Sequence, residues 1–350
     1  RHSRFGGGNG CTTMDGLWII SAVVISFGIT AISGIWLLPI LRKLKFGQTI
    51  LDIGPKWHKN KQGTPTMGGL MFIIGVTVSV VVSYMLLRFN SPLGERPDSP
   101  MIKARLLYGL MLAIAFGLIG FADDYIKIIR KHNEGLTPRQ KLLLQTMFGI
   151  IYLLLLYISG SRSTVLTFPF LGSIDIGILY YPFALFAILA LSNAVNFTDG
   201  LDGLLSSVTF VVGIAYMIIT SILQRWEMGI MAAAMAGGCL GFLIWNFYPA
   251  KVFMGDTGSL FLGGLIIALA FGTGLPVYIV LIGLIYVVEA ASVVIQMTYF
   301  KLTHGKRIFK MSPIHHHFEL CGYSEVQIVV AFTLVTAVAS VLAIWAVRLL

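Results

Sequence analysis

Residues 17–40 read LWIISAVVISFGITAISGIWLLPI, a run that contains no Asp, Glu, Lys or Arg. An α-helix needs about 20 predominantly apolar residues to cross the hydrocarbon core of a bilayer, so this run predicts a transmembrane helix. Polar, Gly and Pro clusters divide the rest of the chain into comparable apolar stretches: 67–88, 104–125, 140–159, 179–196, 201–223, 227–247, 257–272, 275–300 and 326–348. The sequence therefore predicts an all-α integral membrane protein with about ten transmembrane helices.

The composition of the 350-residue chain agrees with this fold class, because 57% of the residues are hydrophobic and only 11% are charged. A soluble domain typically has about 25% charged residues, and a disordered chain is poor in apolar ones. Soluble enzymes and disordered proteins are therefore excluded. The connections are short, so we expect residues 17–350 to form a single transmembrane domain. The Gly-rich start suggests that residues 1–16 combine an expression remnant with an extracytoplasmic N-terminal segment.

The positive charges predict the orientation in the membrane. The formal net charge is +10, and sixteen of the 25 Lys and Arg residues lie in or beside four connections on one side. By the positive-inside rule this side is cytoplasmic, which places both termini outside. The connections assigned to the cytoplasm are 41–66, 126–139, 197–200, 248–256 and 301–325. The excess charge suits anionic lipids and phosphate-bearing substrates, and no basic patch with interleaved aromatics indicates nucleic-acid binding.

Two smaller features complete the outline of the chain. An alternating stretch from Thr164 to Ile178, interrupted by Pro169 and Gly172, predicts a small β-hairpin in an outward connection. The three cysteines are odd in number and show no metal-ligand spacing, so neither a disulfide framework nor a Cys-ligated metal is expected.

Acidic residues near membrane ends are the most informative polar groups. Asp123 and Asp124 end the third stretch in GFADDY, Asp199 and Asp202 open the sixth in NAVNFTDGLDG, and Asp256 opens the eighth in FMGDTGS. A carboxylate at membrane depth is costly and usually functional. Five acids meeting at the cytoplasmic end of a bundle would repel one another, so we expect a cation among them. Carboxylates without thiolates suit a hard ion such as Mg²⁺.

The Asp123–Asp124 pair sits at a helix C-terminus, where the helix dipole is already negative. A bound metal or a nearby cation such as Lys127 would compensate for this. The alternative is that both acids reach the interface and pair there with Lys127 and Arg130.

Asp199 and Asp202 are three residues apart, so they share one face at a helix start. An N-cap followed by a first-turn acid is a serious alternative. Asn193 and Asn196 lie about one turn earlier. Two amides and two acids exceed what capping requires, and such a set suits hydrogen bonding to a base and a ribose.

The segment from Gly255 to Ser259 reads GDTGS. Its glycines allow close approach of the backbone to a ligand, and a new helix N-terminus offers N–H groups to phosphate. The GK[ST] ending of a P-loop is absent. The glycines alone fit a tight turn, but Asp256 among them favours a metal ligand.

His315, His316 and His317 follow Ser312-Pro313 in the last cytoplasmic connection. Three consecutive residues point in different directions and no fourth ligand is suitably spaced, so a zinc site is disfavoured. A donor or proton shuttle at a pyrophosphate is the better interpretation.

In the ninth stretch, Glu289 and Gln296 share a helix face. A structural hydrogen bond inside the bundle is one explanation of that pair.

Five segments together resemble one enzyme family. They are KQGTPTMGG (61–69), FADDYIK (121–127), NAVNFTDGLDG (193–203), NFYPAKVFMGDTGSLFLGG (246–264) and MSPIHHHFE (311–319). In this order they resemble the phospho-N-acetylmuramoyl-pentapeptide transferases of bacterial peptidoglycan synthesis. That family belongs to the polyprenyl-phosphate N-acetylhexosamine-1-phosphate transferases. The likeness runs from about residue 17 to residue 350.

The resemblance implies ten transmembrane helices, a cytoplasmic active site, a multi-pass location in the bacterial cytoplasmic (inner) membrane, and commonly a homodimer. It implies transfer of phospho-N-acetylmuramoyl-pentapeptide from UDP to undecaprenyl phosphate, which gives lipid I and UMP and requires Mg²⁺. Residues 17–350 would then be the catalytic domain. The alternatives are a sister transferase that moves N-acetylglucosamine-1-phosphate to the same lipid or, as a different class, a membrane transporter. Transporters tend to place acids near the midplane and often contain inverted repeats, and neither feature is seen here.

The resemblance also assigns roles to residues. Asp256 falls on the metal ligand, and Asp123 and Asp124 fall on the side of the lipid phosphate. The residues that it places in catalysis are Asp123, Asp124, Asp256 and His315. The expected uridine pocket comprises Asn196, Asp199, Asp202, Asn246 and Phe253, with Phe253 stacked on uracil. The other expected substrate contacts are Lys61 (or Lys59), Lys127, Asn193, Gly255, Ser259, Gln296, His315 and His316.

Overall fold

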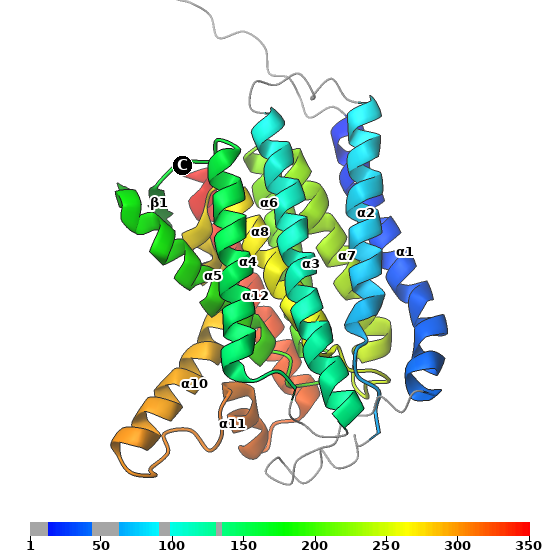
Figure 1. The fold of residues 1–350 in the computed structure, drawn as a ribbon, viewed down its shortest axis with the longest axis vertical. Helices are drawn as coiled ribbons and strands as arrows, with labels where there is room; N and C mark the ends of the chain where they lie inside the picture. Colours follow the sequence, from blue (N-terminus) through cyan, green and yellow to red (C-terminus); the bar gives the residue numbers. More distant parts are fainter. Residues whose placement is uncertain (1–12, 44–62, 91–98, 131–134) are drawn as a thin grey trace, which may run out of the picture.

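The computed structural model describes residues 13–43, 63–90, 99–130 and 135–350, and it is almost entirely helical (Figure 1). Within these ranges ten helices are long and apolar enough to cross a membrane, which confirms the prediction of about ten. They are α1 (Thr13–Lys43), α2 (Gly69–Asn90), α3 (Ser99–Arg130), α4 (Pro138–Ile158), α5 (Tyr180–Phe197), α6 (Leu204–Ile222), α7 (Trp226–Asn246), α8 (Gly255–Gly272), α10 (Leu284–Leu302) and α12 (Glu325–Arg348).

The short elements lie between these helices. The predicted hairpin is confirmed as β1 (Val165–Phe168) and β2 (Gly172–Asp175), which pair antiparallel with Val165 opposite Asp175. The remaining elements are the 3-10 turns η3 (Gly177–Leu179) and η4 (Pro276–Tyr278) and the helices α9 (Ile279–Ile282) and α11 (Ile314–Leu320).

The predicted ninth span, 275–300, was wrong in its boundaries and its continuity. The chain forms η4 and α9 first, breaks at Gly283, and only then begins the spanning helix α10. Pro276 favours a helix start, and Gly283 has a non-helical backbone with φ −105° and ψ 34°. From this break α10 leans away from the bundle toward its far end (Figure 1).

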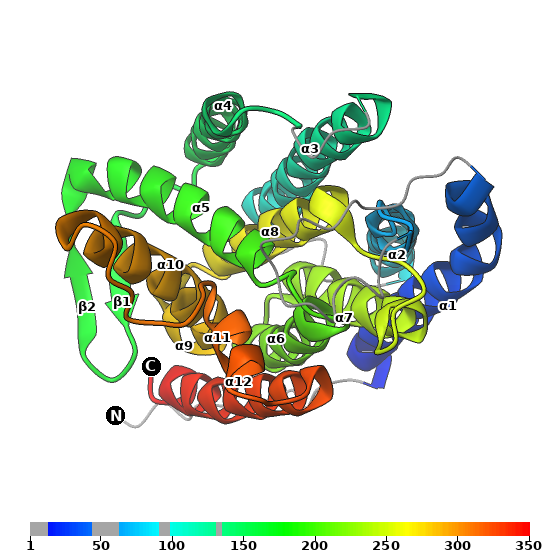
Figure 2. The same ribbon diagram turned by 90° about the horizontal axis from the view of Figure 1, so that it is seen from below.

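Helix α8 forms the centre of the bundle, with α3 and α5 beside it (Figure 2). Its residues from Thr257 to Gly272 are all buried. Helices in a membrane associate mainly through close packing, which small residues permit. At Gly120 a Cβ would collide with the backbone carbonyl of Asp256, so this glycine lets the C-terminal part of α3 approach the start of α8.

Hydrogen bonds join several loops at that end of the bundle. The Phe253 N–H donates to the Pro65 carbonyl at 2.8 Å, and the Gly68 N–H donates to the Phe253 carbonyl at 2.8 Å. The Asn246 amide accepts from the Gly203 N–H at 3.1 Å and donates to the Val252 carbonyl at 3.0 Å. The starts of α2, α6 and α8 are thereby tied together. The C-terminus lies at the opposite end (Figure 1), and the assignment of the termini to the outside stays a prediction.

Candidate active site

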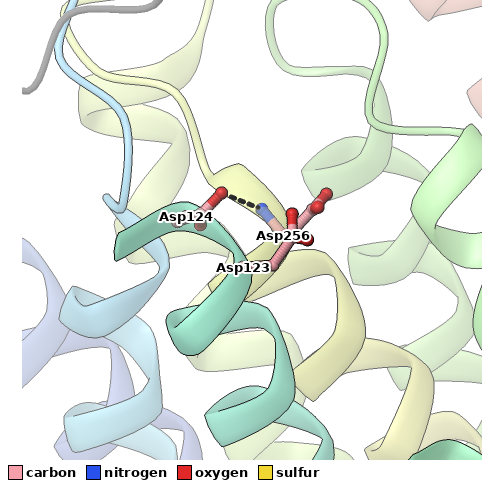
Figure 3. Close-up of side chains that lie close together, drawn as sticks. All are labelled: Asp123, Asp124 and Asp256. Carbon is pink, nitrogen blue, oxygen red and sulfur yellow. Dashed lines mark hydrogen bonds between the residues drawn. The ribbon is translucent and has the colours of Figure 1, made fainter. Parts of the chain in front are cut away.

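Three carboxylates from two helices meet at this end of the bundle (Figure 3). Asp123 and Asp124 lie in the C-terminal part of α3, and Asp256 lies in the first turn of α8. One oxygen atom from each lies within 4.8 Å of the others. Both acids of α3 are buried and Asp256 is partly buried. In the described part of the chain, no other set of three or more His, Cys, Asp or Glu side chains has metal-binding spacing.

Asp124 is bonded to the N-terminus of α8 through both carboxylate oxygens. Its Oδ1 accepts from the Asp256 N–H at 3.2 Å. Its Oδ2 accepts from the Thr257 N–H at 2.9 Å and from the Thr257 hydroxyl at 2.7 Å. These N–H groups have no partner within their own helix, and the helix dipole favours an anion here. Asp124 therefore caps α8 from a neighbouring helix and fixes the position of Asp256.

Two lysines offset the negative charge of the cluster. The Lys127 Nζ lies 2.6 Å from Asp123 Oδ2 and 3.0 Å from Asp256 Oδ2, and the Lys141 Nζ is also 3.0 Å from Asp256 Oδ2. With all five groups ionised, three carboxylates and two ammonium groups leave a net charge of −1. The cluster is thus ready for a further cation. The alternative of acids paired with Lys127 and Arg130 at the interface is confirmed only for the pairing of Asp123 with Lys127, because both α3 acids are buried.

Asp123 also holds the segment just before α4. Its Oδ1 accepts from the Leu136 N–H at 2.7 Å, and a Cβ at Gly135 would lie against the same oxygen. Its Oδ2 lies 2.6 Å from the Lys127 Nζ and accepts no backbone hydrogen bond within the described residues. Asp123 is therefore more available than Asp124 for an ion or a substrate.

Asn196 links α5 to the first turn of α8. Its amide Nδ2 lies 2.8 Å from Asp256 Oδ1 and 2.7 Å from the Ser259 hydroxyl oxygen, and donates to both. The Ser259 hydroxyl donates to the Gly255 carbonyl at 3.1 Å. Gly255 has φ +73°, which favours glycine, and a Cβ there would strike Asp124. The four residues Asn196, Gly255, Asp256 and Ser259 thus form one connected group.

Asp199 lies in the loop between α5 and α6, outside the membrane-spanning segments. Burial, followed by the charges of Asp256, Asp124 and Asp202, raises the pKa of its carboxyl to about 8. The ionised form of Asp199 is therefore disfavoured near neutral pH until positive charge enters the cluster.

Comparison with known proteins identifies the family of this chain. The model of glycosyl transferase family 4 matches residues 106–274, and a phospho-N-acetylmuramoyl-pentapeptide-transferase signature matches residues 61–73. The phospho-N-acetylmuramoyl-pentapeptide-transferase of Acetivibrio thermocellus is 45% identical over 333 residues, which cover 93% of this chain and 94% of that protein. The chain belongs to the phospho-N-acetylmuramoyl-pentapeptide-transferase family. Two further enzymes of the same name are similar to this chain. The one from Clostridium perfringens is 46% identical and the match covers 91% of this chain and 96% of that protein. The one from Halalkalibacterium halodurans is 44% identical and the match covers 93% of this chain and 97% of that protein.

Several residues predicted to contact the substrate use their polar groups within the protein, to hold loops or to join helices. Asp202 Oδ2 accepts from the Ala250 N–H at 2.9 Å. Asn193 donates to Gln145 Oε1 at 3.0 Å, inside the bundle. Gln296 Oε1 accepts from the backbone N–H groups of Ile308 and Phe309 at 3.1 and 3.0 Å.

The capping alternative for Asp199 and Asp202 is wrong. The N-cap of α6 is Gly203, in a left-handed conformation with φ +76°, and no side chain caps that helix. Asp202 is instead 4% exposed and lies against the loop after α7.

The side chains of the three histidines point in different directions, as predicted. His315 Nδ1 contacts Glu289 Oε1 at 3.0 Å, His316 Nδ1 contacts Glu319 Oε2 at 2.6 Å, and His317 Nδ1 accepts from the Lys310 N–H at 3.1 Å. The suggested Glu289–Gln296 hydrogen bond was wrong, because Glu289 pairs with His315 and Gln296 holds the loop after α10. A shared helix face shows that two side chains are neighbours, but other elements packed on that face compete for them.

Sequence reasoning missed the role of Lys141 and the pairing of Glu289 with His315. Lys141 was visible as one of the basic residues at the start of the chain's fourth apolar stretch. Phe253 is half-buried, in a loop fixed by its own backbone hydrogen bonds. Lys59 and Lys61 lie outside the described residues.

Proposed function

We propose that this chain transfers phospho-N-acetylmuramoyl-pentapeptide from its UDP carrier to undecaprenyl phosphate, forming lipid I and UMP with Mg²⁺ as cofactor. One observation carries the proposal: in a chain of this family, the acids of α3 and α8 converge with two lysines at one end of a ten-helix bundle. A diphosphate substrate and a phosphate acceptor are both anions. A site that joins them needs compensating positive charge, and the group of Lys127 and Lys141 supplies part of it.

The residues present fit a hard divalent ion. Oxygen atoms bound to one Mg²⁺ lie about 2.1 Å from it and so no more than about 4.2 Å apart. The spacing within 4.8 Å therefore needs only small side-chain movements. We assign the ion to Asp256, with Asp123 nearby, because Asp124 uses both oxygens to bind backbone N–H groups of α8, whereas the oxygens of Asp256 are bonded to side chains. When bound, the ion supplies charge neutralisation at the diphosphate.

The protein's own residues have separable tasks in this proposal. Asp124, Asn196 and Lys141 hold Asp256 in place, each by a direct hydrogen bond to its backbone or its carboxylate. Lys127 bridges Asp123 and Asp256 and is placed to hold phosphate oxygens when the carboxylates turn to the ion.

The nucleophile requires little help from a base. The second pKa of a phosphate monoester is near 6, so the lipid phosphate is mostly deprotonated at neutral pH. Asp123 therefore orients the nucleophile or the ion. We favour a single in-line displacement at the β-phosphorus over a covalent phosphoryl–Asp intermediate, although a carboxylate is chemically able to form one.

The test is a UMP-release assay in detergent, with each substrate added alone and then both together. The proposal expects UMP only when the UDP-linked substrate, the lipid phosphate and Mg²⁺ are all present. Stoichiometric UMP from the UDP-linked substrate alone would overturn the single displacement. Preference for UDP-N-acetylglucosamine would indicate the sister transferase, and no UMP under any condition would leave transport as the better explanation.

We further propose that the chain works in the bacterial cytoplasmic membrane as a homodimer, with the acid cluster facing the cytoplasm. The excess of Lys and Arg in the connections at that end supports the orientation.

A further inference from the structure

Glu289 is a carboxylate that lies completely inside the bundle. It belongs to α10 and is 0% exposed, and its Oε1 is 3.0 Å from Nδ1 of His315 in α11, which is 1% exposed. An ionisable group in a membrane protein interior is costly and needs a partner. An ionised carboxylate only accepts hydrogen bonds, so a neutral imidazole beside an ionised Glu289 carries its proton on Nδ1 and offers Nε2 as an acceptor.

The other edge of the same imidazole faces the loop between α5 and α6. His315 Nε2 lies so close to Gly200 that a Cβ there would collide with it. Within the described residues this buried nitrogen has no hydrogen-bond partner. Gly200 directly follows Asp199, whose carboxyl interacts electrostatically with Asp256. Contacts thus run from the interior of α10, through His315, to the loop beside the acid cluster.

We propose that Glu289 is a positioning residue for the transfer reaction: it holds the His315 ring so that Nε2 accepts a hydrogen bond from the UDP-linked substrate beside Gly200. The inference rests on the proposed function, and it assigns to Glu289 an effect on one substrate only. The competing explanation is a structural pair that fastens α11 to α10 and has no effect on substrate affinity.

The first test is Glu289→Gln in the full-length protein. Glutamine keeps the size of the side chain but can donate to Nδ1, which moves the imidazole proton to Nε2 and removes the acceptor. We expect the KM for the UDP-linked substrate to rise at least about tenfold, or about 1.4 kcal/mol. The KM for the lipid phosphate should stay within about twofold. The matched control is Ser292→Ala, one turn along α10, because among the described residues the Ser292 hydroxyl bonds only to the Glu289 carbonyl, at 2.7 Å.

A double-mutant cycle then asks whether Glu289 acts through His315. If it does, adding Glu289→Gln to a His315→Asn chain should leave the KM for the UDP-linked substrate unchanged. Additive effects, equal changes in both KM values, or a lower melting temperature with unchanged KM values would each overturn the proposal.

Nitrogen-15 NMR of labelled histidine gives a readout that needs no turnover. The wild-type His315 should show a protonated Nδ1 and a bare Nε2, and Glu289→Gln should reverse this pattern. Identical spectra would overturn the inference even if the transferase assay succeeds. Absence of UMP release by the wild type would overturn the proposed function instead, and the spectra would still decide whether Glu289 orients His315.

Discussion

Replacing Asp124 by Asn should destabilise the protein more than replacing its neighbour Asp123 by Asn, although both changes remove one charge from the same cluster. Asp124 accepts three hydrogen bonds from the first turn of α8, at 3.2, 2.9 and 2.7 Å. Asp123 accepts one backbone hydrogen bond, from Leu136 at 2.7 Å. An asparagine at 124 keeps one acceptor oxygen and turns an amide donor toward N–H groups of α8.

The cost follows from these contacts. A hydrogen bond to a charged group contributes about 1.5–3 kcal/mol, and loss of an N-cap costs about 0.5–2 kcal/mol. We take the stability lost with the hydrogen bonds of Asp124 as about 3 kcal/mol. The variant also relieves repulsion between Asp124 and the neighbouring carboxylates, which returns about 1 kcal/mol of stability. For a chain of 350 residues, the net loss of about 2 kcal/mol corresponds to a melting temperature lower by roughly 3 °C. Asp123→Asn keeps the Leu136 bond and loses the ion pair with Lys127, but Lys127 keeps Asp256 as a partner at 3.0 Å, so the melting temperature should stay within about 1 °C.

The assay is thermal unfolding of the detergent-solubilised protein in EDTA, followed by tryptophan fluorescence. Wild type, Asp123→Asn and Asp124→Asn are compared in the same buffer. Equal shifts for the two variants, or a larger one for Asp123→Asn, would refute the conclusion that Asp124 acts mainly as the cap of α8.

Three further predictions address the remaining parts of the site. Asp256→Asn should abolish UMP release while the far-UV circular dichroism spectrum stays unchanged, and near-normal turnover would remove Asp256 from the ion site. Lys141→Met should lower kcat about a hundredfold, because an ammonium group 3.0 Å from Asp256 is lost, whereas the exposed Lys301→Met should not. The raised pKa of Asp199, about 8, means that the folded protein keeps a proton that the unfolded chain loses near pH 4. The stability that this group contributes therefore falls as pH rises from about 4 to 8. Asp199→Asn should make the melting temperature, measured in EDTA, decline less steeply over this pH range. Parallel curves of melting temperature against pH for the variant and the wild type would contradict this.

The fold and the centre of the site were predictable because they depend on strong local signals. A long apolar run such as 17–40 has few alternatives to a membrane span. Asp123 lies near the C-terminus of α3 and Asp256 at the N-terminus of α8, and these two helices cross the bilayer in opposite directions, so both acids fall in one layer. The sequence therefore predicted which acids lie at the same level of the bundle.

The partners of individual side chains were harder to predict, because they depend on helix rotation and tilt. The apolar pattern does not show that Lys141 turns toward α8, or that α11 brings His315 back to Glu289. The break at Gly283 was missed for a related reason: glycine is common within transmembrane helices, so one glycine in an apolar run is a weak sign of a helix end.

Binding of Mn²⁺ in place of Mg²⁺, followed by electron paramagnetic resonance with the UDP-linked substrate present, tests the central claim most directly. The account predicts one tightly bound ion per chain, phosphorus-31 coupling that places a phosphate in contact with it, and loss of that ion in Asp256→Asn. Undiminished Mn²⁺ binding in Asp256→Asn, or a bound ion without phosphorus coupling, would contradict the claim that α3 and α8 hold an ion against the diphosphate.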